Sequence, residues 1–324
     1  MECTRPLQGY HARGGGFTAN LKQAIRIGNV FAKLTVPCGK CFACRERKAS
    51  DWSIRMIHEA QMHTASSFIT LTYNNESIPE DGSLKIEHFQ KFMKRFRKSI
   101  QPARIRFYHC GEYGKVQTTP RNSRSVEFLA HPFQGDRQAH GRPHYHAIIF
   151  GWDFPDKTQW SIRNNHPVYR SAQLEKLWPF GHSEIGTVTY DSAKYVAGYI
   201  QKKINGEESV DYYKRVDEQG QIHTLQPEYA TMSRRPGIGM PWLEKYHQEI
   251  WGYDECIVNG KSKPVPRAYT SRLKIDDPET YKKIIDQRAK NAKLKKHERT
   301  PERLAMKDKL GIIRLKQKTR ELPK

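Results

Sequence analysis

One short segment, Gly141-Arg-Pro-His-Tyr-His-Ala-Ile-Ile-Phe-Gly151, constrains the fold more than any other part of the chain. Aromatic and β-branched residues lie between a proline and a glycine, a composition typical of a β-strand. Side chains alternate between the two faces of a strand, so His144 and His146 are expected on the same face. Two imidazoles that point the same way can ligate one divalent ion. The alternative is a pair of hydrogen-bonded polar residues beside an apolar strand.

The charge of the chain indicates its class of partner. There are 56 Lys and Arg residues against 34 Asp and Glu, a net charge of +22 over 324 residues. This surplus favours nucleic acid first and an anionic membrane second. No apolar run approaches the roughly 18 residues that a membrane span requires, and Met1-Glu-Cys-Thr-Arg-Pro6 is not a signal peptide. We therefore expect a cytoplasmic, DNA-binding protein without a membrane partner.

Three of the six cysteines, Cys38, Cys41 and Cys44, lie within seven residues. In a reducing compartment this spacing favours a metal site over disulfides. A tetrahedral zinc site needs four ligands, so a fourth must come from elsewhere. Cys3 is the first candidate for that ligand and Cys110 the second. The alternative is a set of small buried side chains at the start of a helix.

Apolar periodicity and turn residues divide the chain into predicted helices and strands. Helices are predicted over 45–63, 85–100, 172–177 and 191–204, and strands over 68–73, 104–110, 143–151 and 184–190. Antiparallel strands with helices on one face form an α+β fold. Residues 5–30 are expected to form an irregular arm, and 115–140 a polar surface insertion. Glu112 is expected in a turn between Gly111 and Gly114.

These elements group into three predicted segments. Residues 1–63 form an N-terminal arm with the cysteine motif and a helix, 64–250 form the main domain with the insertion 115–140, and 251–324 form a basic, mainly helical tail. From Lys261 onward there are 21 Lys and Arg residues against 8 Asp and Glu, and Thr300-Pro301 separates two helices. Such a tail is expected to bind DNA backbones of any sequence; the alternative is a solvated extension.

The helix predicted over 191–204 carries a pair of tyrosines. Tyr195 and Tyr199 are four residues apart and therefore share a helix face. Lys202 and Lys203 follow about one turn later. A phenol is a poor nucleophile at neutral pH unless a cation or a metal-bound phosphate assists it. The commoner role for such a pair is the edge of a hydrophobic core.

Two further groups of basic residues are candidate DNA contacts. Lys94 and Arg95 lie on the predicted helix 85–100, whose polar face is crowded with cations. Arg234 and Arg235 open the stretch Arg234-Arg-Pro-Gly-Ile-Gly239, which suits a loop that grips phosphate. A solvated helix face and an ordinary basic turn are the respective alternatives.

The chain resembles the HUH-type replication initiators of small single-stranded DNA phages, the Microviridae, and within them the gokushovirus-like branch. Three motifs occur in the family's order: Phe68-Ile-Thr-Leu-Thr-Tyr73, then Pro143-His-Tyr-His146, then the helix with two tyrosines. Pro37-Cys-Gly-Lys-Cys41 and Met232-Ser-Arg-Arg-Pro-Gly-Ile-Gly239 are also similar to that family. The resemblance covers roughly residues 1–250. Tyr145 departs from the family's pattern, which has a hydrophobic residue between the histidines.

The resemblance implies a fold and an activity. The fold would be the ferredoxin- or RRM-like antiparallel sheet of HUH endonucleases over 64–250, followed by the basic helical extension. The protein would be a site-specific single-stranded DNA endonuclease and ligase that starts rolling-circle replication through a 5′-phosphotyrosine intermediate. Its partners would be the single-stranded origin and a host helicase and polymerase in the host cytoplasm. The chain itself has no phosphate-binding loop motif of a helicase.

The resemblance also implies roles for individual residues. Mg²⁺ or Mn²⁺ would be held by His144, His146 and Glu112, with His109 as the competing third ligand. Tyr195 and Tyr199 would be the nucleophiles, and Lys202 or Lys203 would stabilise the phenolate or grip the phosphate. Zn²⁺ would be structural, held by the cysteine motif.

Three other classes of function remain open at this point. A non-catalytic DNA-binding protein would keep the charge but would not need the paired tyrosines. A zinc hydrolase built on two histidines would usually need an acidic residue shortly afterwards, and Ala147-Ile148-Ile149 contains none. A relaxase or transposase shares the same chemistry, and its target DNA would be the distinguishing feature.

Overall fold

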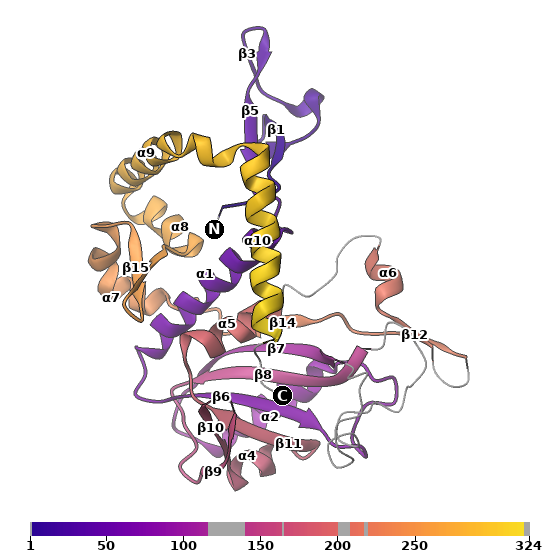
Figure 1. The fold of residues 1–324 in the computed structure, drawn as a ribbon. Coiled ribbons are helices and arrows are strands. Elements are labelled where there is room, and N and C mark those ends of the chain that lie inside the picture. The colour runs from indigo at the N-terminus through magenta and orange to yellow at the C-terminus, as the bar shows by residue number, and fades with distance from the viewer. Residues whose placement is uncertain (1, 116–139, 164, 200–207, 217–219, 321–324) are drawn as a thin grey trace. The chain divides into compact units, whose positions relative to one another are not determined.

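The computed structural model describes all residues except 1, 116–139, 164, 200–207, 217–219 and 321–324 (Figure 1). Nearly all of the predicted insertion 115–140 therefore lies outside the described residues. The chain divides into two compact units. Unit 1 combines Met1–Ser50 with Thr270–Lys324, and unit 2 consists of Asp51–Tyr269. No helix in the described part of the chain has the length and apolar composition needed to cross a bilayer.

Unit 2 is built on a seven-stranded antiparallel sheet, which confirms the predicted α+β class. The strand order is β14-β7-β8-β6-β11-β10-β9, and Figure 1 shows β8 between β7 and β6. The strands are β6 (Ser66–Tyr73), β7 (Arg106–Lys115), β8 (His140–Phe150), β9 (Thr158–Arg163), β10 (His166–Arg170), β11 (Gly181–Gly186) and β14 (Tyr229–Met232). The strand predicted around His144 and His146 is therefore a central strand of the sheet.

The two faces of this sheet differ in burial. One face, the core face, carries Ile69, Leu71 and Tyr73 of β6 and packs against helix α2 (Ile86–Ser99), whose Phe92 and Phe96 are fully buried. The other face, the histidine face, carries the residues of β6 between these, which are half-buried. The strict alternation of β6 reflects this difference, since only one of its faces belongs to the main core.

Two helices contact the histidine face, one that precedes β6 in the sequence and one that follows β11. Helix α1 (Phe42–Ala60) brings Trp52 to within 5.1 Å of the Tyr108 ring, measured between centroids. Helix α5 (Tyr190–Tyr199) brings Tyr195 against Phe68. The other elements of unit 2 are α4 (Ala172–Leu177), α6 (Glu208–Tyr212), β12 (Lys214–Val216), β13 (Ile222–Thr224), α7 (Met240–Trp251), β15 (Glu255–Val258), β16 (Lys261–Pro264) and the start of α8 (Arg267–Asp276).

Unit 1 joins segments from both ends of the sequence. Its three-stranded sheet has the order β2-β1-β5, with β1 at Leu7–His11, β2 at Phe17–Thr18 and β5 at Lys33–Val36. The remaining elements are η1 (Leu21–Gln23), the β3–β4 hairpin (Arg26–Ile27 with Val30–Phe31), α9 (Pro278–Leu294), η2 (Lys296–Arg299) and α10 (Pro301–Arg320). Asp308 of α10 accepts hydrogen bonds from Thr4 (2.7 Å) and Arg5 (2.6 Å). The predicted helix boundary at Thr300-Pro301 is confirmed.

Some predicted elements are wrong. The arm over 5–30 contains strands, each too short to give a clear alternating pattern. The predicted turn after Cys110 is a continuation of β7. Gly111 leaves room for the side chains of Tyr229 and Leu84, which a Cβ atom there would approach to 2.9 and 3.1 Å. The close contact between β7 and β8 instead requires Gly141 of β8, since a Cβ atom on Gly141 would lie 2.2 Å from the carbonyl oxygen of Gly114. The loop expected after Trp152 contains the β9–β10 hairpin, although the short helix within it is confirmed at Ala172–Leu177.

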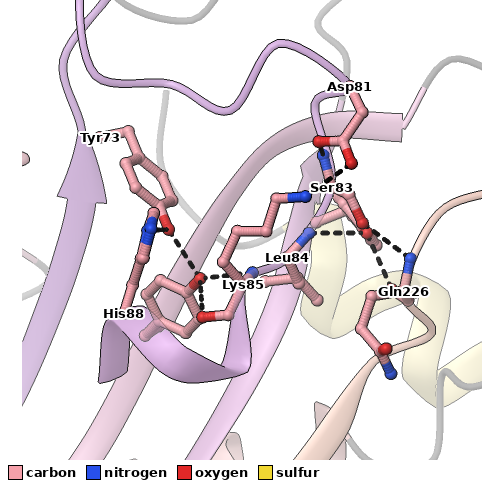
Figure 2. A network of polar contacts seen from close by, with 9 residues as sticks. Tyr73, Asp81, Ser83, Leu84, Lys85, His88 and Gln226 are labelled. Carbon is pink, nitrogen blue, oxygen red and sulfur yellow. Dashed lines mark hydrogen bonds and ion pairs between the residues drawn. The ribbon is translucent and has the colours of Figure 1, made fainter. Parts of the chain in front are cut away.

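Tyr145, which lies between the two histidines, anchors the start of α2 to β8. Its hydroxyl accepts a hydrogen bond from the backbone N–H of Lys85 and donates one to the Lys85 carbonyl, both at 2.9 Å. The Tyr73 hydroxyl lies 2.8 Å from that of Tyr145 and 2.7 Å from Nδ1 of His88. Lys85 immediately precedes α2 and supplies no capping side chain, so Tyr145 fixes where the helix begins. Figure 2 shows Tyr73, His88 and Lys85 of this network.

A second set of contacts in the same place fixes the segment before α2. Figure 2 shows Asp81 between the ammonium group of Lys85 (2.7 Å) and the backbone N–H of Ser83 (3.0 Å). The Ser83 hydroxyl accepts from the backbone N–H of Gln226 at 2.8 Å. Polar contacts therefore connect β8, the start of α2 and the chain before β14.

We expect Tyr145→Phe to lower the free energy of unfolding by about 1–3 kcal/mol, because it leaves the backbone N–H of Lys85 without its hydrogen-bond partner and removes one hydrogen bond each from the Lys85 carbonyl and the Tyr73 hydroxyl. Urea unfolding followed by circular dichroism measures the change. Tyr108→Phe is the matched control, since the Tyr108 hydroxyl is buried without a hydrogen-bond partner among the described residues. Its cost should stay within about 0.5 kcal/mol. Equal costs for the two variants would contradict the anchoring role.

Candidate functional site

Three side chains meet on the histidine face of the sheet. The register of β7 and β8 pairs Glu112 with His144, and Cys110 with His146. Oε1 of Glu112 lies 2.7 Å from Nε2 of His144 and 3.1 Å from Nε2 of His146. The atoms that the three residues offer to a metal lie within 4.8 Å of one another. We call this group the Glu-His-His trio.

The other ring nitrogens of the trio are also held. Nδ1 of His144 lies 3.0 Å from the carbonyl oxygen of Arg142, and Nδ1 of His146 lies 3.0 Å from the Thr70 hydroxyl. A carbonyl only accepts hydrogen bonds, so Nδ1 of His144 carries the proton. A neutral His144 would then turn the lone pair of Nε2 toward the Glu112 carboxylate. Either a second proton or a cation must lie between these two atoms.

The charge of Glu112 suits a cation. Burial alone would raise the pKa of Glu112, but hydrogen bonds from His144 and His146 and their charges outweigh burial and lower the pKa to about 2. The carboxylate is therefore ionised at neutral pH. One carboxylate and two imidazoles, each imidazole oriented by a second hydrogen bond, form a donor set that fits a divalent transition metal such as Mn²⁺.

His109, the alternative third ligand, points to the other face of the sheet. Its ring stacks on Phe89 with centroids 3.4 Å apart, and its Nδ1 lies 3.0 Å from the Thr231 hydroxyl. Burial, and secondarily the charge of His146, lowers the pKa of His109 well below its usual value. The structure thus brings Glu112, and not His109, together with the histidine pair.

Tyr195 of α5 lies beside the trio. Its ring centroid is 5.2 Å from that of His146, and its side chain is 49% exposed. Ala193, Val196 and Ala197 are buried and hold the helix on the sheet. The helix begins at Tyr190, one residue earlier than expected, and the Thr189 hydroxyl accepts a hydrogen bond from the backbone N–H of Ser192 (3.1 Å).

The structure describes only part of the remaining tyrosine motif. The backbone of Tyr199 belongs to α5, one turn after Tyr195. The side chain of Tyr199 and both lysines, Lys202 and Lys203, lie outside the described part. Their roles stay predictions.

The loop with Arg234 and Arg235 is held by side chains that sequence reasoning missed. Gly239 closes the loop in the left-handed region (φ +76°) and donates its N–H to buried Glu59 at 2.7 Å. Glu59 also forms an ion pair with Arg106 (2.7 Å). Arg234 and Arg235 themselves are exposed. No local pattern relates α1, β7 and this loop, so only the tertiary structure identifies the buried pair.

Lys94 and Arg95 lie on α2, which packs on the core face, away from the trio. Lys94 is exposed. Arg95 donates two hydrogen bonds, of 3.1 Å and 2.8 Å, to the carbonyl oxygen of Leu177 at the end of α4. Arg95 therefore connects two helices, and DNA binding by either residue stays a prediction.

The four predicted zinc ligands come together in unit 1. The sulfur atoms of Cys3, Cys38, Cys41 and Cys44 all lie within 4.8 Å of one another. Sγ of Cys3 is 3.7 Å from that of Cys38 and 3.8 Å from that of Cys41. A tetrahedral zinc ion with Zn–S bonds of about 2.3 Å separates its sulfur ligands by about 3.8 Å. Cys110, the alternative ligand, is buried in β7 of unit 2.

Backbone groups support this cysteine cluster. The N–H of Cys38 donates to Sγ of Cys3, and the N–H of Cys41 donates to Sγ of Cys38, both at 3.3 Å. Gly39 adopts a left-handed conformation (φ +74°), which lets the chain turn around the sulfur atoms. N–H donors stabilise thiolate sulfur, so the cluster suits a bound cation.

Comparisons with known proteins agree with this arrangement. A family model for replication-associated proteins of the ORF2 group matches residues 66–124 and 120–204, a region that contains both the trio and α5. The chain is 31% identical to "Replication-associated protein VP4" of Bdellovibrio phage phiMH2K over 284 residues, which cover 87% of this chain and 80% of the relative.

Two further relatives carry similar names. "Replication-associated protein ORF4" of Chlamydia phage 1 is 28% identical and covers 74% of this chain, which spans 53% of that relative. "Replication-associated protein ORF2" of Spiroplasma virus 4 is 27% identical, with 84% of this chain and 80% of the relative covered. No solved structure matches. The chain therefore belongs to the family of replication-associated proteins of small single-stranded DNA phages.

Proposed function

We propose that this protein is a site-specific single-stranded DNA endonuclease and ligase of the HUH type, which starts rolling-circle replication. The observation that carries the proposal is Tyr195 beside the Glu-His-His trio, with 5.2 Å between the ring centroids of Tyr195 and His146. A candidate nucleophile and a candidate metal site thus share one face of a sheet. The central strand with two histidines and the antiparallel order also support the ferredoxin- or RRM-like fold of HUH endonucleases.

The trio supplies the residues that would hold Mg²⁺ or Mn²⁺. Glu112, His144 and His146 would be the ligands, and Thr70 and the Arg142 carbonyl would orient the two imidazoles. A divalent cation bound there would polarise a non-bridging oxygen of the scissile phosphate. Imidazole ligands favour Mn²⁺ over Mg²⁺, which prefers oxygen ligands and water.

The tyrosines of α5 would carry out the strand transfer. The phenolic oxygen of Tyr195 or Tyr199 forms a bond to phosphorus and loses its proton to solvent, while the bond between phosphorus and the 3′ oxygen breaks. The departing oxygen takes up a proton and becomes a 3′-OH that primes synthesis. The phosphotyrosine link conserves the phosphodiester for rejoining, so no nucleotide cofactor is needed. With two tyrosines, one can hold the 5′ end while the other cleaves the regenerated origin.

Unit 1 would contribute the structural zinc and affinity for DNA backbones. Between Cys3 and Arg45 the chain contains seven Lys and Arg residues and no Asp or Glu. The basic α9 and α10 belong to the same unit. Arg5 is paired with Asp308, and the surplus of positive charge on this unit would bind the phosphates of DNA of any sequence. A host helicase and polymerase would complete the replication machinery in the host cytoplasm.

A relaxase or a transposase would use the same residues, and the target DNA distinguishes them from a replication initiator. The names of the relatives favour replication. A DNA-binding protein without catalysis would not need an ionised carboxylate between two imidazoles beside an exposed tyrosine. The enzyme is therefore the better proposal.

We expect Glu112→Gln to weaken Mn²⁺ binding by about tenfold or more, since even residues that only orient metal ligands contribute that much. Electron paramagnetic resonance of Mn²⁺ measures the binding, and nicking of origin DNA should fall with it while DNA binding is retained. Glu87→Gln is the control, because it removes one negative charge from the exposed surface of α2. Full nicking by Glu112→Gln, or by the wild type in excess chelator, would exclude the metal role.

Tyr195→Phe and Tyr199→Phe should each impair strand transfer and circularisation, and at least one of them should retain a single nick. The double variant should form no covalent adduct with labelled origin DNA. Tyr190→Phe, at the start of the same helix, is the control and should react like the wild type. Mass spectrometry of the adduct identifies the nucleophile; we expect Tyr199 for the first cut because Lys202 follows it by three residues. Cleavage without an adduct on either tyrosine would rule out the mechanism.

Purified protein should contain about one zinc ion per chain, and Cys38→Ser should lose it together with the folded structure of unit 1. Atomic absorption gives the metal content, and limited proteolysis reports on unit 1. Cys256→Ser, which changes a buried cysteine outside the cluster, should keep the zinc. A folded, active preparation without zinc would show that the cluster needs no metal.

A further inference from the structure

An exposed tryptophan lies at the edge of the large sheet. Trp160 of β9, the outermost strand on that side, is 57% exposed. The guanidinium carbon of Arg170 in β10 lies 3.8 Å from the centroid of its ring. One face of the indole is thus held by a cation, and the side chain still presents a large part of its surface to solvent. We call this pair the edge platform.

The strand registers place Arg170 on the histidine face. Thr72 of β6 pairs with His144 on one side and with His182 of β11 on the other, so these three residues share a face. Tyr169 of β10 pairs with Ile185 of β11, whose side chain belongs to the core face. Because neighbouring residues alternate, Arg170 points to the histidine face.

Contacts across the strands place the tryptophan there too. The ring of Trp160 lies against Arg170. The register shift leaves Trp160 without a paired residue in β10 and interrupts the alternation of β9 at this point. Beyond the shift, Arg163 forms two hydrogen bonds of 2.7 Å with Glu184 of β11, which pairs with Thr70 on the histidine face. The edge platform and the trio therefore belong to one face of one sheet.

The surface between the trio and the edge platform is not buried. Its residues on β6, β11 and β10 are all half-exposed in the structure: Thr70, Thr72, His182, Glu184, Val168 and Arg170. Four strand spacings separate β8 from β9, or about 19 Å at roughly 4.8 Å per strand. A single strand with its scissile phosphate at the trio needs only a few nucleotides to reach Trp160.

The local charge favours a nucleic acid on this path. Burial lowers the pKa of His182, and the positive charges of Arg170 and Arg142 lower it further against the opposing charges of Glu184 and Glu175. These guanidinium groups therefore act on the middle of the path, where they would also attract phosphates. Exposed aromatic rings with neighbouring cations on a sheet are what single-stranded bases stack on.

We propose that the edge platform stacks one base of the single-stranded substrate and so sets how the strand crosses the sheet toward the trio. The inference rests on the proposed function for the identity of the strand. A second protein strand added to β9 is the other candidate occupant. The register shift between Val168 and Tyr169 makes the edge irregular, and irregular edges disfavour strand addition.

Binding without cleavage tests this inference. The full-length, zinc-loaded protein is titrated into fluorescein-labelled single-stranded origin DNA without added Mg²⁺ or Mn²⁺, and anisotropy gives the affinity. Trp160→Ala should weaken binding by about tenfold, the scale of losing one stacked base. Trp160→Phe should restore most of the affinity. Ile162→Ala is the matched control: it lies on the same strand and is 65% exposed, but it pairs with Pro167, two residues before Tyr169, and therefore belongs to the other face.

An abasic scan of the same oligonucleotide locates the stacked base. In the wild type, loss of one base a few nucleotides from the nick site should weaken binding about tenfold. The same lesion should have little further effect on Trp160→Ala. Affinity of Trp160→Ala equal to that of Ile162→Ala would overturn the proposal. So would self-association of the wild type in sedimentation that Trp160→Ala abolishes with unchanged DNA affinity, because the platform would then bind protein.

These outcomes are independent of nicking. If the wild type formed no phosphotyrosine adduct with Mn²⁺, the proposed endonuclease would fail, while the titration without added Mg²⁺ or Mn²⁺ would still report on the platform. If the adduct formed and the titration showed no loss for Trp160→Ala, the platform alone would fail.

Discussion

The pairing of β7 with β8 is the constraint on which the rest of unit 2 depends. It places Glu112 opposite His144, and it requires a glycine at position 141, since a Cβ atom there would meet the Gly114 carbonyl. A shift of the pairing by one residue would turn the carboxylate to the core face. The same shift would bury its charge without partners. The geometry of the trio and the strand register are therefore one property of this sheet.

The central strand serves both faces at once. His144 and His146 point to one side, while Tyr145 between them points to the other and holds the start of α2 through Lys85. A hydrophobic residue at this position would fill the core equally well but would leave the helix start without those hydrogen bonds. The hydroxyl group explains why a tyrosine is tolerated inside a His-x-His motif. It ties the orientation of the histidine strand to the packing beneath it.

The sequence patterns identify the parts of the site whose signals are local. The histidine strand, the helix with Tyr195 and the cysteine spacing each follow from residues close together in the chain. Glu112 is correctly predicted to join the two histidines, but it is predicted in a turn and lies in a strand. A glycine that makes room for neighbouring side chains cannot be distinguished, in the sequence, from a glycine that forms a turn.

Longer-range features have no comparable signal. The β9 strand is exposed at nearly every position, so it lacks the alternation that marks a half-buried strand. The buried pair of Glu59 and Arg106 is distant in sequence and becomes visible only when α1 lies on the sheet. The short strands of the N-terminal arm, some only two residues long, give no periodicity to detect.

The contact of Asp308 with Thr4 and Arg5 joins one segment that is synthesised early with another that is synthesised late. Residues 51–269 form a continuous unit and can fold while synthesis is still in progress. Unit 1 cannot, because its first segment lacks α10 until more than two hundred further residues have been added. The cysteine cluster leaves the ribosome early, but the unit around it closes late. This phage replication protein thus completes its basic unit only after the unit that carries the trio has been made.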